Sequence, residues 1–277
     1  MKISVAKSAG FCFGVKRAIT IALDAARAGK VFMLGDIVHN EEVVGTIQHV
    51  GIKKIERLTP TKDRILLLRA HGTSRRLIEK ARRCGYVLID ATCLMVKEIH
   101  RTAQACERKK QTIIVIGDKN HDEVKGIIGN LRRKAIIIDT QRNIPVAALK
   151  KTKKACIVVQ STQNEDTTRK IVTIIKKHIP QVAFYNTICK PTRDKQEEIK
   201  KMPLKNEVMI IIGSKTSANT KRLYEISRSL NSRSHWISSW KELKKRWFKD
   251  IRTVGVTAGA STPEETIQQV VRFLKRV

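Results

Sequence analysis

The sequence predicts an α/β fold in which three small domains each carry a mostly parallel sheet. Short runs rich in β-branched residues alternate along the 277 residues with amphipathic segments of about 12 to 18 residues, a pattern typical of buried strands covered by helices. Three cysteines that each follow such a run, Cys12, Cys93 and Cys189, lie 81 and 96 residues apart, which indicates three lobes of similar length. We expect domains over residues 13–93, residues 94–188, and residues 189–277 together with residues 1–12.

Eleven strands are expected, which suits several small sheets better than one. In chain order they cover residues 3–6, 31–37, 65–70, 87–90, 113–117, 135–139, 156–160, 182–185, 208–213, 235–237 and 253–257. Nine of them are followed by thiol, imidazole, carboxyl, hydroxyl or amide side chains, namely Cys12, His39, His71, Cys93, His121 with Glu123, Ser161 with Thr162, Cys189, Ser217 with Asn219, and Ser261. Ligands of parallel sheets bind beyond the carboxyl ends of the strands. If the three lobes turn these ends inward, the nine groups meet in one central cavity.

The charge of the chain is strongly positive. Fifty-six Lys and Arg residues against 25 Asp and Glu residues give a formal net charge of +31, which predicts attraction to acidic partners but says nothing about the fold. The basic residues are spread along the chain and are densest at 150–154 and 241–249, without an arginine-rich tail, RNA-recognition aromatics or a paired CxxC zinc pattern. We interpret the charge as a solvated face plus compositional bias, and we do not expect nucleic acid as a partner.

Composition also bears on the class of protein. An apolar content of 42% excludes global disorder. The longest apolar runs, such as residues 208–212, are far shorter than the ~18 residues of a membrane span, so no membrane association is expected. The first residues lack the long apolar core of a secretory signal. We therefore expect a soluble, cytoplasmic protein.

The six cysteines fall into two groups. No two lie within five residues of each other, which argues against a zinc ribbon or a thioredoxin-type pair, and without a secretory signal disulfides are not expected. Cys84, Cys106 and Cys156 stand in ordinary helix or strand sequence and are interpreted as packed small hydrophobic residues. The other three each follow an apolar run and precede a helix-like stretch.

Three thiolates from three lobes, without a fourth cysteine, suit an iron–sulfur cluster better than zinc. A cubane cluster takes four ligands, so three would leave one iron open as a Lewis acid toward a substrate oxygen. Helices that begin after Cys12 and Cys93 would point N–H groups at this anionic cluster, around which we expect the lobes to be arranged with pseudo-threefold symmetry. The histidine, hydroxyl and amide groups suit an anionic ligand such as a diphosphate. Glu123, a carboxylate placed beside a histidine, is the natural proton donor.

Eight ordered motifs resemble those of the 4-hydroxy-3-methylbut-2-enyl diphosphate reductase (HMBPP reductase) family. They are GFCFGV at 10–15, DIVHN at 36–40, RAHG at 69–72, DATC at 90–93, HDEV at 121–124, TIC at 187–189, GSKTSAN at 213–219 and TAGAS at 257–261. The resemblance covers essentially the whole chain, and three cysteine motifs combined with three histidine motifs make it specific.

The resemblance implies a set of roles. Cys12, Cys93 and Cys189 would bind three irons of a [4Fe–4S] cluster, and the fourth iron would take the hydroxyl oxygen of the substrate. The diphosphate would be held by His39, His71, Ser217, Ala218, Asn219 and Ser261. His121 would orient the substrate, Glu123, with Thr162, would deliver protons to the leaving hydroxyl, and Ser161 would contact the substrate.

The implied reaction removes water from the substrate with two electrons and two protons. Its products would be isopentenyl and dimethylallyl diphosphate, at the last step of the non-mevalonate isoprenoid pathway. A ferredoxin or a flavodoxin would supply the electrons, and the basic surface of this chain suits such acidic carriers.

The sequence departs from the family pattern at several positions. They are Leu94 and Asp122, where proline is common; Pro191, where alanine is common; Ser161, in place of a threonine; and Ala218, where serine or glycine is common. Ala218 removes one expected phosphate donor, and Asp122 adds a carboxylate beside Glu123.

Two other functions remain open on the residues alone. A hydratase or dehydratase could use the same open iron and would need no electron donor. A nucleic-acid-binding or redox-sensing relative would keep the fold without catalysis, and its binding would be strongly salt-dependent.

Overall fold

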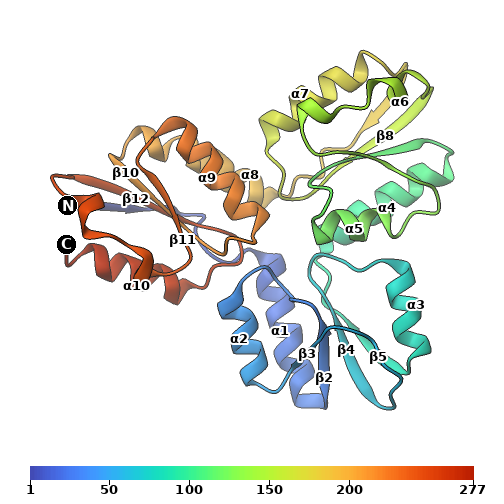
Figure 1. Cartoon of the computed structure of the whole chain (residues 1–277), viewed down its shortest axis with the longest axis horizontal. Coiled ribbons are helices and arrows are strands. Elements are labelled where there is room, and N and C mark those ends of the chain that lie inside the picture. The colour runs from blue at the N-terminus through green and yellow to red at the C-terminus, as the bar shows by residue number, and fades with distance from the viewer. The chain divides into compact units, whose positions relative to one another are not determined.

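Three four-stranded sheets make up the computed structural model, which describes all 277 residues, and every pair of neighbouring strands is parallel (Figure 1). Sheet A contains β1 (Lys2–Val5), β12 (Thr253–Ala258), β10 (Val208–Ile212) and β11 (Ser234–Ile237). Sheet B contains β3 (Lys53–Ile55), β2 (Val31–Leu34), β4 (Arg64–Leu68) and β5 (Tyr86–Asp90). Sheet C contains β7 (Ile136–Ile138), β6 (Thr112–Ile116), β8 (Lys154–Val159) and β9 (Gln181–Phe184). The expected α/β fold with parallel sheets is confirmed.

The three sheets repeat one topology. Sheet B has the order β3-β2-β4-β5 and sheet C the order β7-β6-β8-β9, so the first strand of each group lies second in its sheet and the last strand lies at an edge. Sheet A, read as β11-β10-β12-β1, has the same order, with the N-terminal strand β1 in the place of the last strand. The edge strands β1, β5 and β9 are therefore equivalent, and each is the strand that precedes one of the three predicted cluster cysteines.

Ten α-helices connect the strands. They are α1 (Phe13–Ala28), α2 (Glu41–His49), α3 (Arg75–Arg83), α4 (Leu94–Arg108), α5 (Asp122–Ile128), α6 (Val146–Lys150), α7 (Glu165–Lys176), α8 (Lys190–Ile199), α9 (Ala218–Leu230) and α10 (Glu264–Leu274). The expected helix length is correct for α1, α4, α7 and α9 and wrong for the others, which have 5 to 11 residues. The strands are short, and about 11 helical residues already span a five-residue strand.

Strand β3 is the element that the sequence did not predict. Its sequence is Lys-Lys-Ile, and both lysines are exposed at the edge of sheet B, so no apolar pattern marks it. Backbone pairing with β2 is enough to hold it there. Strand β2 also ends earlier than expected, at Leu34, because Gly35 adopts a φ of +73°.

Apolar strands form the cores. All five residues of β10 are buried, as are five of the six residues of β8, which is the continuous apolar pattern of strands covered on both faces. None of the helices combines the length and the apolar character that crossing a membrane requires.

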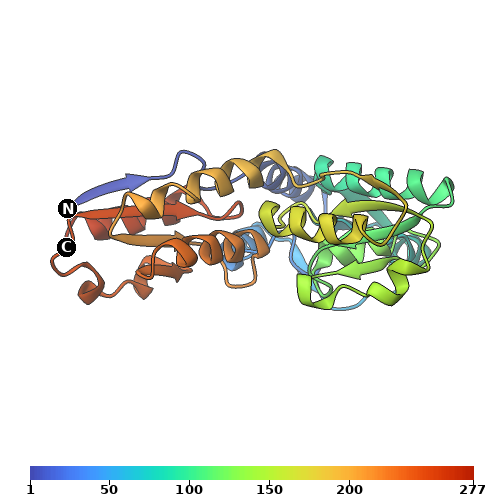
Figure 2. The same ribbon diagram turned by 90° about the horizontal axis from the view of Figure 1, so that it is seen from above.

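The chain divides into two compact units. The first unit contains Met1–Lys16, Val38–Thr46 and Lys190–Val277, and so holds sheet A; the second contains Arg17–Ile37 and Ile47–Cys189, and so holds sheets B and C. The two chain termini both belong to the first unit and lie side by side in both views (Figures 1 and 2). The three predicted domain boundaries stay a prediction.

Candidate functional site

The three predicted cluster cysteines occupy equivalent positions in the repeated topology. Each stands between an edge strand and a helix: α1 begins directly after Cys12, α4 after Cys93 and α8 after Cys189. The backbone N–H of each cysteine donates a hydrogen bond to the loop that follows the neighbouring strand, with acceptors Ala260 O (3.0 Å), Ala70 O (3.0 Å) and Ser161 O (3.1 Å) respectively. The backbone therefore has the same local arrangement around all three thiols.

The surroundings of these thiols suit an anionic cluster. All three side chains are partly exposed. Helices α1, α4 and α8 carry no acidic residue in their first turn, a feature that they share with α3, α6 and α9 but not with the other four helices. The positive ends of the three cysteine-bearing helices are thus left to stabilise thiolates and the negative charge of a cluster. The surroundings of each cysteine therefore suit a thiolate ligand of an iron–sulfur group.

In the first unit, the N-terminus of α9 carries an unsatisfied amide. Asn219 is 4% exposed, and neither its Oδ1 nor its Nδ2 has a hydrogen-bond partner. Leaving such a group buried and unpaired costs about 1–3 kcal/mol, so the position suits a side chain that awaits a polar ligand. The adjacent Ser217 caps the helix by accepting a bond from Thr220 N (3.3 Å), and Ala218 between them offers no side-chain donor.

Ser261 is engaged by protein in this structure. Its hydroxyl donates to the backbone oxygen of His39 at 2.9 Å, so it joins the loop after β12 to the histidine ahead of α2. The two acidic residues that follow this histidine are occupied by hydroxyls, Glu41 by Ser214 (2.8 Å) and Glu42 by Thr266 (2.6 Å). Hydroxyl donors therefore engage both of these carboxylates beside His39.

In the second unit, Glu123 is a buried carboxyl with one protein partner. It is 2% exposed, and Ser161 approaches both of its oxygens, with the backbone N–H 2.6 Å from Oε1 and the hydroxyl 2.8 Å from Oε2. Burial raises the pKa of Glu123 to about 7 against the lowering effect of these two hydrogen bonds, with a smaller upward contribution from Asp118. A carboxyl with this pKa holds a transferable proton near neutral pH.

His121 is oriented by the same helix. It caps α5, and its Nδ1 accepts a hydrogen bond from the backbone N–H of Glu123 at 3.1 Å. Because a backbone N–H can only donate, a neutral His121 must carry its proton on Nε2. Its ring lies edge-on to that of His71, with centroids 5.7 Å apart. The second unit thus brings Glu123, Ser161, His121 and His71 together.

The additional carboxylate at Asp122 is neutralised. It pairs with Arg69 at 2.7 Å, and both side chains are mostly buried. Asp118, and not Asp122, contributes to the raised pKa of Glu123. The negative charge that Asp122 adds is therefore compensated by Arg69, which lies in the loop that precedes His71.

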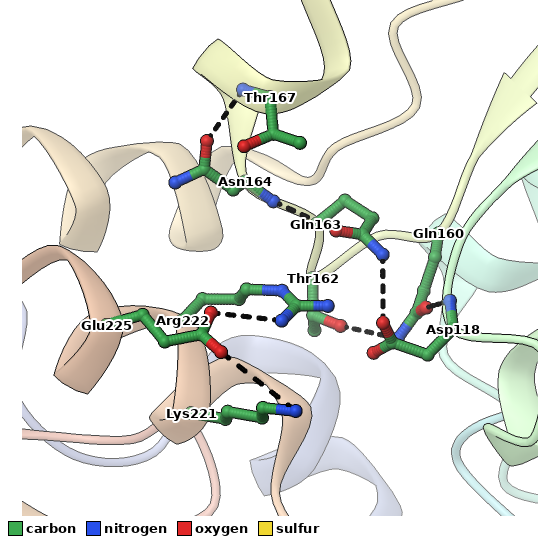
Figure 3. Close-up of polar contacts among 9 residues, drawn as sticks. All are labelled: Asp118, Gln160, Thr162, Gln163, Asn164, Thr167, Lys221, Arg222 and Glu225. Carbon is green, nitrogen blue, oxygen red and sulfur yellow. Dashed lines mark hydrogen bonds and ion pairs between the residues drawn. The ribbon is translucent and has the colours of Figure 1, made fainter. Parts of the chain in front are cut away.

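Thr162 lies in a different polar cluster from the one that the sequence indicated. Its hydroxyl accepts a hydrogen bond from Gln160 at 2.9 Å (Figure 3). It makes no hydrogen bond with Glu123, whose carboxylate is held by Ser161. Gln160 also accepts from the backbone of Asp118 (2.8 Å), and Gln163 donates to the Asp118 carboxylate (3.3 Å). Separately, on α9 of the first unit, Glu225 pairs with Arg222 (3.0 Å) and Lys221 (3.9 Å).

Two residues that sequence reasoning missed support the His71 loop. Asn130 donates from Nδ2 to Gly126 O (2.7 Å) and Thr73 O (2.9 Å), and this atom lies 3.4 Å from His100 Nδ1. The His100 ring covers Gly72, where an added Cβ would lie 2.8 Å from Cε1. Burial lowers the pKa of His100 to about 4, so the ring is neutral at physiological pH. The available signal was that His100 stands four residues after the buried Val96 on α4, a spacing that places both on one face of the helix.

The remaining cysteines are packed in the cores of their sheets. Cys106 and Cys156 are 3% and 0% exposed among apolar residues of sheet C, and burial raises the pKa of Cys156 far above its ordinary value. Cys84 packs against the core of sheet B. This agrees with their interpretation as small hydrophobic residues.

Comparison with known proteins gives one consistent family. The family model described as "LytB protein" matches residues 3–275. The 4-hydroxy-3-methylbut-2-enyl diphosphate reductase of Aquifex aeolicus is 39% identical over 280 residues, covering 99% of this chain and 96% of the relative. The enzyme of the same name from Geobacter metallireducens is 36% identical over 278 residues, covering 100% and 98%.

Solved structures agree. A structure of (E)-4-hydroxy-3-methyl-but-2-enyl diphosphate reductase, described as the terminal enzyme of the non-mevalonate pathway, is 38% identical, covers 100% of both chains and superposes with a TM-score of 0.73. The E-1-hydroxy-2-methyl-but-2-enyl-4-diphosphate reductase of Plasmodium falciparum is 29% identical, covers 99% of this chain and 88% of its own, and superposes with a TM-score of 0.91.

Proposed function

This chain belongs to the LytB family, and from that membership we infer that it is a 4-hydroxy-3-methylbut-2-enyl diphosphate reductase, the terminal enzyme of the non-mevalonate pathway. The reaction takes up two electrons and two protons, releases the substrate hydroxyl as water, and gives isopentenyl and dimethylallyl diphosphate. It therefore needs a proton donor, a diphosphate site and a group that passes electrons from an external donor to the substrate.

The observation that carries this function is the state of Glu123. A hydroxyl leaves as water only if a proton reaches its oxygen, and a buried carboxyl with a pKa of about 7 holds that proton at neutral pH. Ser161 keeps the carboxyl in one orientation, and His121, which accepts a hydrogen bond at Nδ1, carries its proton on Nε2 when neutral. We assign Glu123 as the proton donor and His121 as the residue that orients the substrate. In our proposal Thr162 has an indirect role, because its hydroxyl binds Gln160 and not Glu123.

We assign the diphosphate to the five side chains that the family motifs indicate, with Ala218 contributing only backbone. They are His39, His71, Ser217, Asn219 and Ser261. The unpaired amide of Asn219 supports this assignment, because a phosphate oxygen would satisfy its Nδ2. Ser261, whose hydroxyl donates to the backbone oxygen of His39, would rotate that hydroxyl toward the diphosphate.

Cys12, Cys93 and Cys189 would hold a [4Fe–4S] cluster, and the three helices that begin beside them would stabilise its charge. When bound, the cluster would pass electrons from the external donor to the substrate. We further propose three domains with the boundaries expected from the sequence, placed around the cluster with pseudo-threefold symmetry, a cytoplasmic location, and an acidic ferredoxin or flavodoxin as the electron donor.

Anaerobic purification tests this function. We expect about four irons per chain and consumption of the substrate only when a reductant is present. Cys93→Ser should lose iron and activity, whereas Cys84→Ser, whose thiol lies against the core of sheet B, should keep both. Turnover without reductant would overturn the reductase function and favour a hydratase. A protein without a cluster and without turnover would also contradict the proposal.

A further inference from the structure

A buried lysine on α8 has no part in the proposed reaction. Lys195 is 2% exposed, and its Nζ donates to Gly10 O (3.1 Å), to Ala258 O (3.2 Å) and to Ser8 O. Three carbonyl acceptors require three N–H hydrogens, which only the protonated ammonium provides. The interior of the first unit therefore contains a positive charge. Burying such a charge is unfavourable unless it is bonded and paired, so its retention calls for an explanation.

Glu198, one helical turn after Lys195, binds the N–H groups of the loop that contains Ser8 and Gly10. Its carboxylate accepts from Lys7 N (2.7 Å), Ser8 N (2.9 Å) and Ser8 Oγ (2.6 Å). Burial raises the pKa of Glu198, but the hydrogen bonds from Ser8 and Lys7 and the charge of Lys195 outweigh this effect and leave the pKa below its usual range. Lys195 thus binds the carbonyls of this loop while Glu198 binds its N–H groups.

The two backbone segments held by Lys195 are the ones that present Cys12. Gly10 lies two residues before the cysteine and has a φ of +87°, a conformation that other residues rarely adopt. Ala258 lies two residues before Ala260, whose carbonyl accepts the N–H of Cys12 at 3.0 Å. Helix α8 begins directly after Cys189, so one helix connects a second cysteine to the backbone around the first.

We propose that Lys195 and Glu198 are positioning residues that hold the backbone of residues 7–12 in the conformation in which Cys12 binds the cluster. We further propose that the buried ammonium of Lys195 raises the reduction potential of the cluster. This proposal rests on the proposed function for its second half. A reduced cluster carries one more negative charge than an oxidised one, and a nearby positive charge in a medium of low dielectric constant stabilises the reduced state. The carboxylate of Glu198 acts in the opposite direction.

The positioning half is tested without a cluster. In the ligand-free protein we compare amide hydrogen exchange in Lys195→Met, Lys195→Arg and Glu198→Gln, with Lys201→Met as the matched control because that lysine is exposed on the same stretch of chain. We expect at least tenfold faster exchange at the Cys12 amide in Lys195→Met and at the Ser8 amide in Glu198→Gln. The control should match the natural protein. Unchanged protection at both amides would overturn the positioning role.

The electrostatic half is tested on the cluster-loaded protein by a potentiometric titration followed by electron paramagnetic resonance. Lys195→Met should lower the midpoint potential, Glu198→Gln should raise it, and Lys195→Arg should leave it near that of the natural protein. A tenfold change in the ratio of reduced to oxidised cluster corresponds to 59 mV for one electron.

Shifts of opposite sign distinguish a charge effect from loosened packing, which would move both variants in the same direction. Shifts of the same sign, or none, overturn this half. If Lys195→Met does not fold, Glu198→Gln and Lys195→Arg still decide both halves. A protein that binds no cluster would refute the proposed function, while the exchange experiment would still test the role of the two residues.

Discussion

Replacing Glu123 with glutamine should make the ligand-free protein more stable at neutral and alkaline pH while it removes activity. The pKa of this carboxyl is about 7 in the folded protein against a reference value of 4.5. Between these values the folded protein keeps a proton that the unfolded chain releases, so its free energy of unfolding falls as the pH rises. Above about pH 7 the loss is complete and amounts to roughly 3 kcal/mol. Glutamine cannot ionise and removes this loss.

The assay is the thermal midpoint Tm of the ligand-free protein between pH 4.5 and 8.5. In a domain of this size each kcal/mol shifts Tm by about 2–4 °C, so Glu123→Gln should match the natural protein near pH 4.5 and exceed it by several degrees at pH 8. Glu265→Gln is the control, because Glu265 is exposed. If the difference in Tm between Glu123→Gln and the natural protein does not grow with pH, the carboxyl is not held protonated by burial, and the proton-donor argument fails.

Kinetics provide an independent readout of the same group. If Glu123 donates a proton, kcat of the natural enzyme should fall tenfold per pH unit above its pKa, since only the protonated fraction is competent. The glutamine variant should bind a cluster and the substrate but not turn over at any pH. Normal turnover by this variant would refute the assignment.

Three further predictions concern the surroundings of the site. Ser161→Ala removes a donor from the Glu123 carboxylate and should raise its pKa, moving the alkaline limb of the kcat profile upward by about one unit, as followed by pH-dependent kinetics. Asn219→Ala removes an unpaired buried amide, so KM should rise about tenfold, the loss of roughly one hydrogen bond, while Tm of the ligand-free protein stays equal or increases. Gly72→Ala should lower Tm and kcat together, because its φ is +86° and the new Cβ would lie 2.8 Å from the His100 ring; an unchanged Tm would contradict this.

Much of the fold could be predicted from the sequence because its central strands are buried on both faces. Runs such as β10 and β8 are apolar along their length and could be located without knowledge of their partners. Strand β3 could not, because two exposed lysines at a sheet edge carry no pattern, and pairing with β2 alone makes it a strand. Six of the ten helices were expected too long, because the length of a helix is set by the strands that it covers.

The residues of the site could also be predicted from the sequence, but the contacts between them could not. The cysteines, histidines and Glu123 follow strands in recognisable motifs, and the comparisons confirm the family that those motifs indicated. The sequence did not distinguish Ser161 from Thr162 as the partner of Glu123, since the direction of a side chain in a loop depends on the backbone around it. Nor did it mark Asp122 as the partner of Arg69, 53 residues away.

The sequence by itself determined the α/β class, the parallel sheets, the ordered motifs and the identity of the groups available for chemistry, because these depend on local pattern and residue type. Only the tertiary structure decided the common strand order of the three sheets, the pairing of β1 with β12, and the burial that raises the pKa of Glu123 to about 7. It also decided that Lys195, one of 56 basic residues, is buried against the backbone that presents Cys12. Burial and long-range pairing arise from residues far apart in the chain, and no local stretch of sequence contains them.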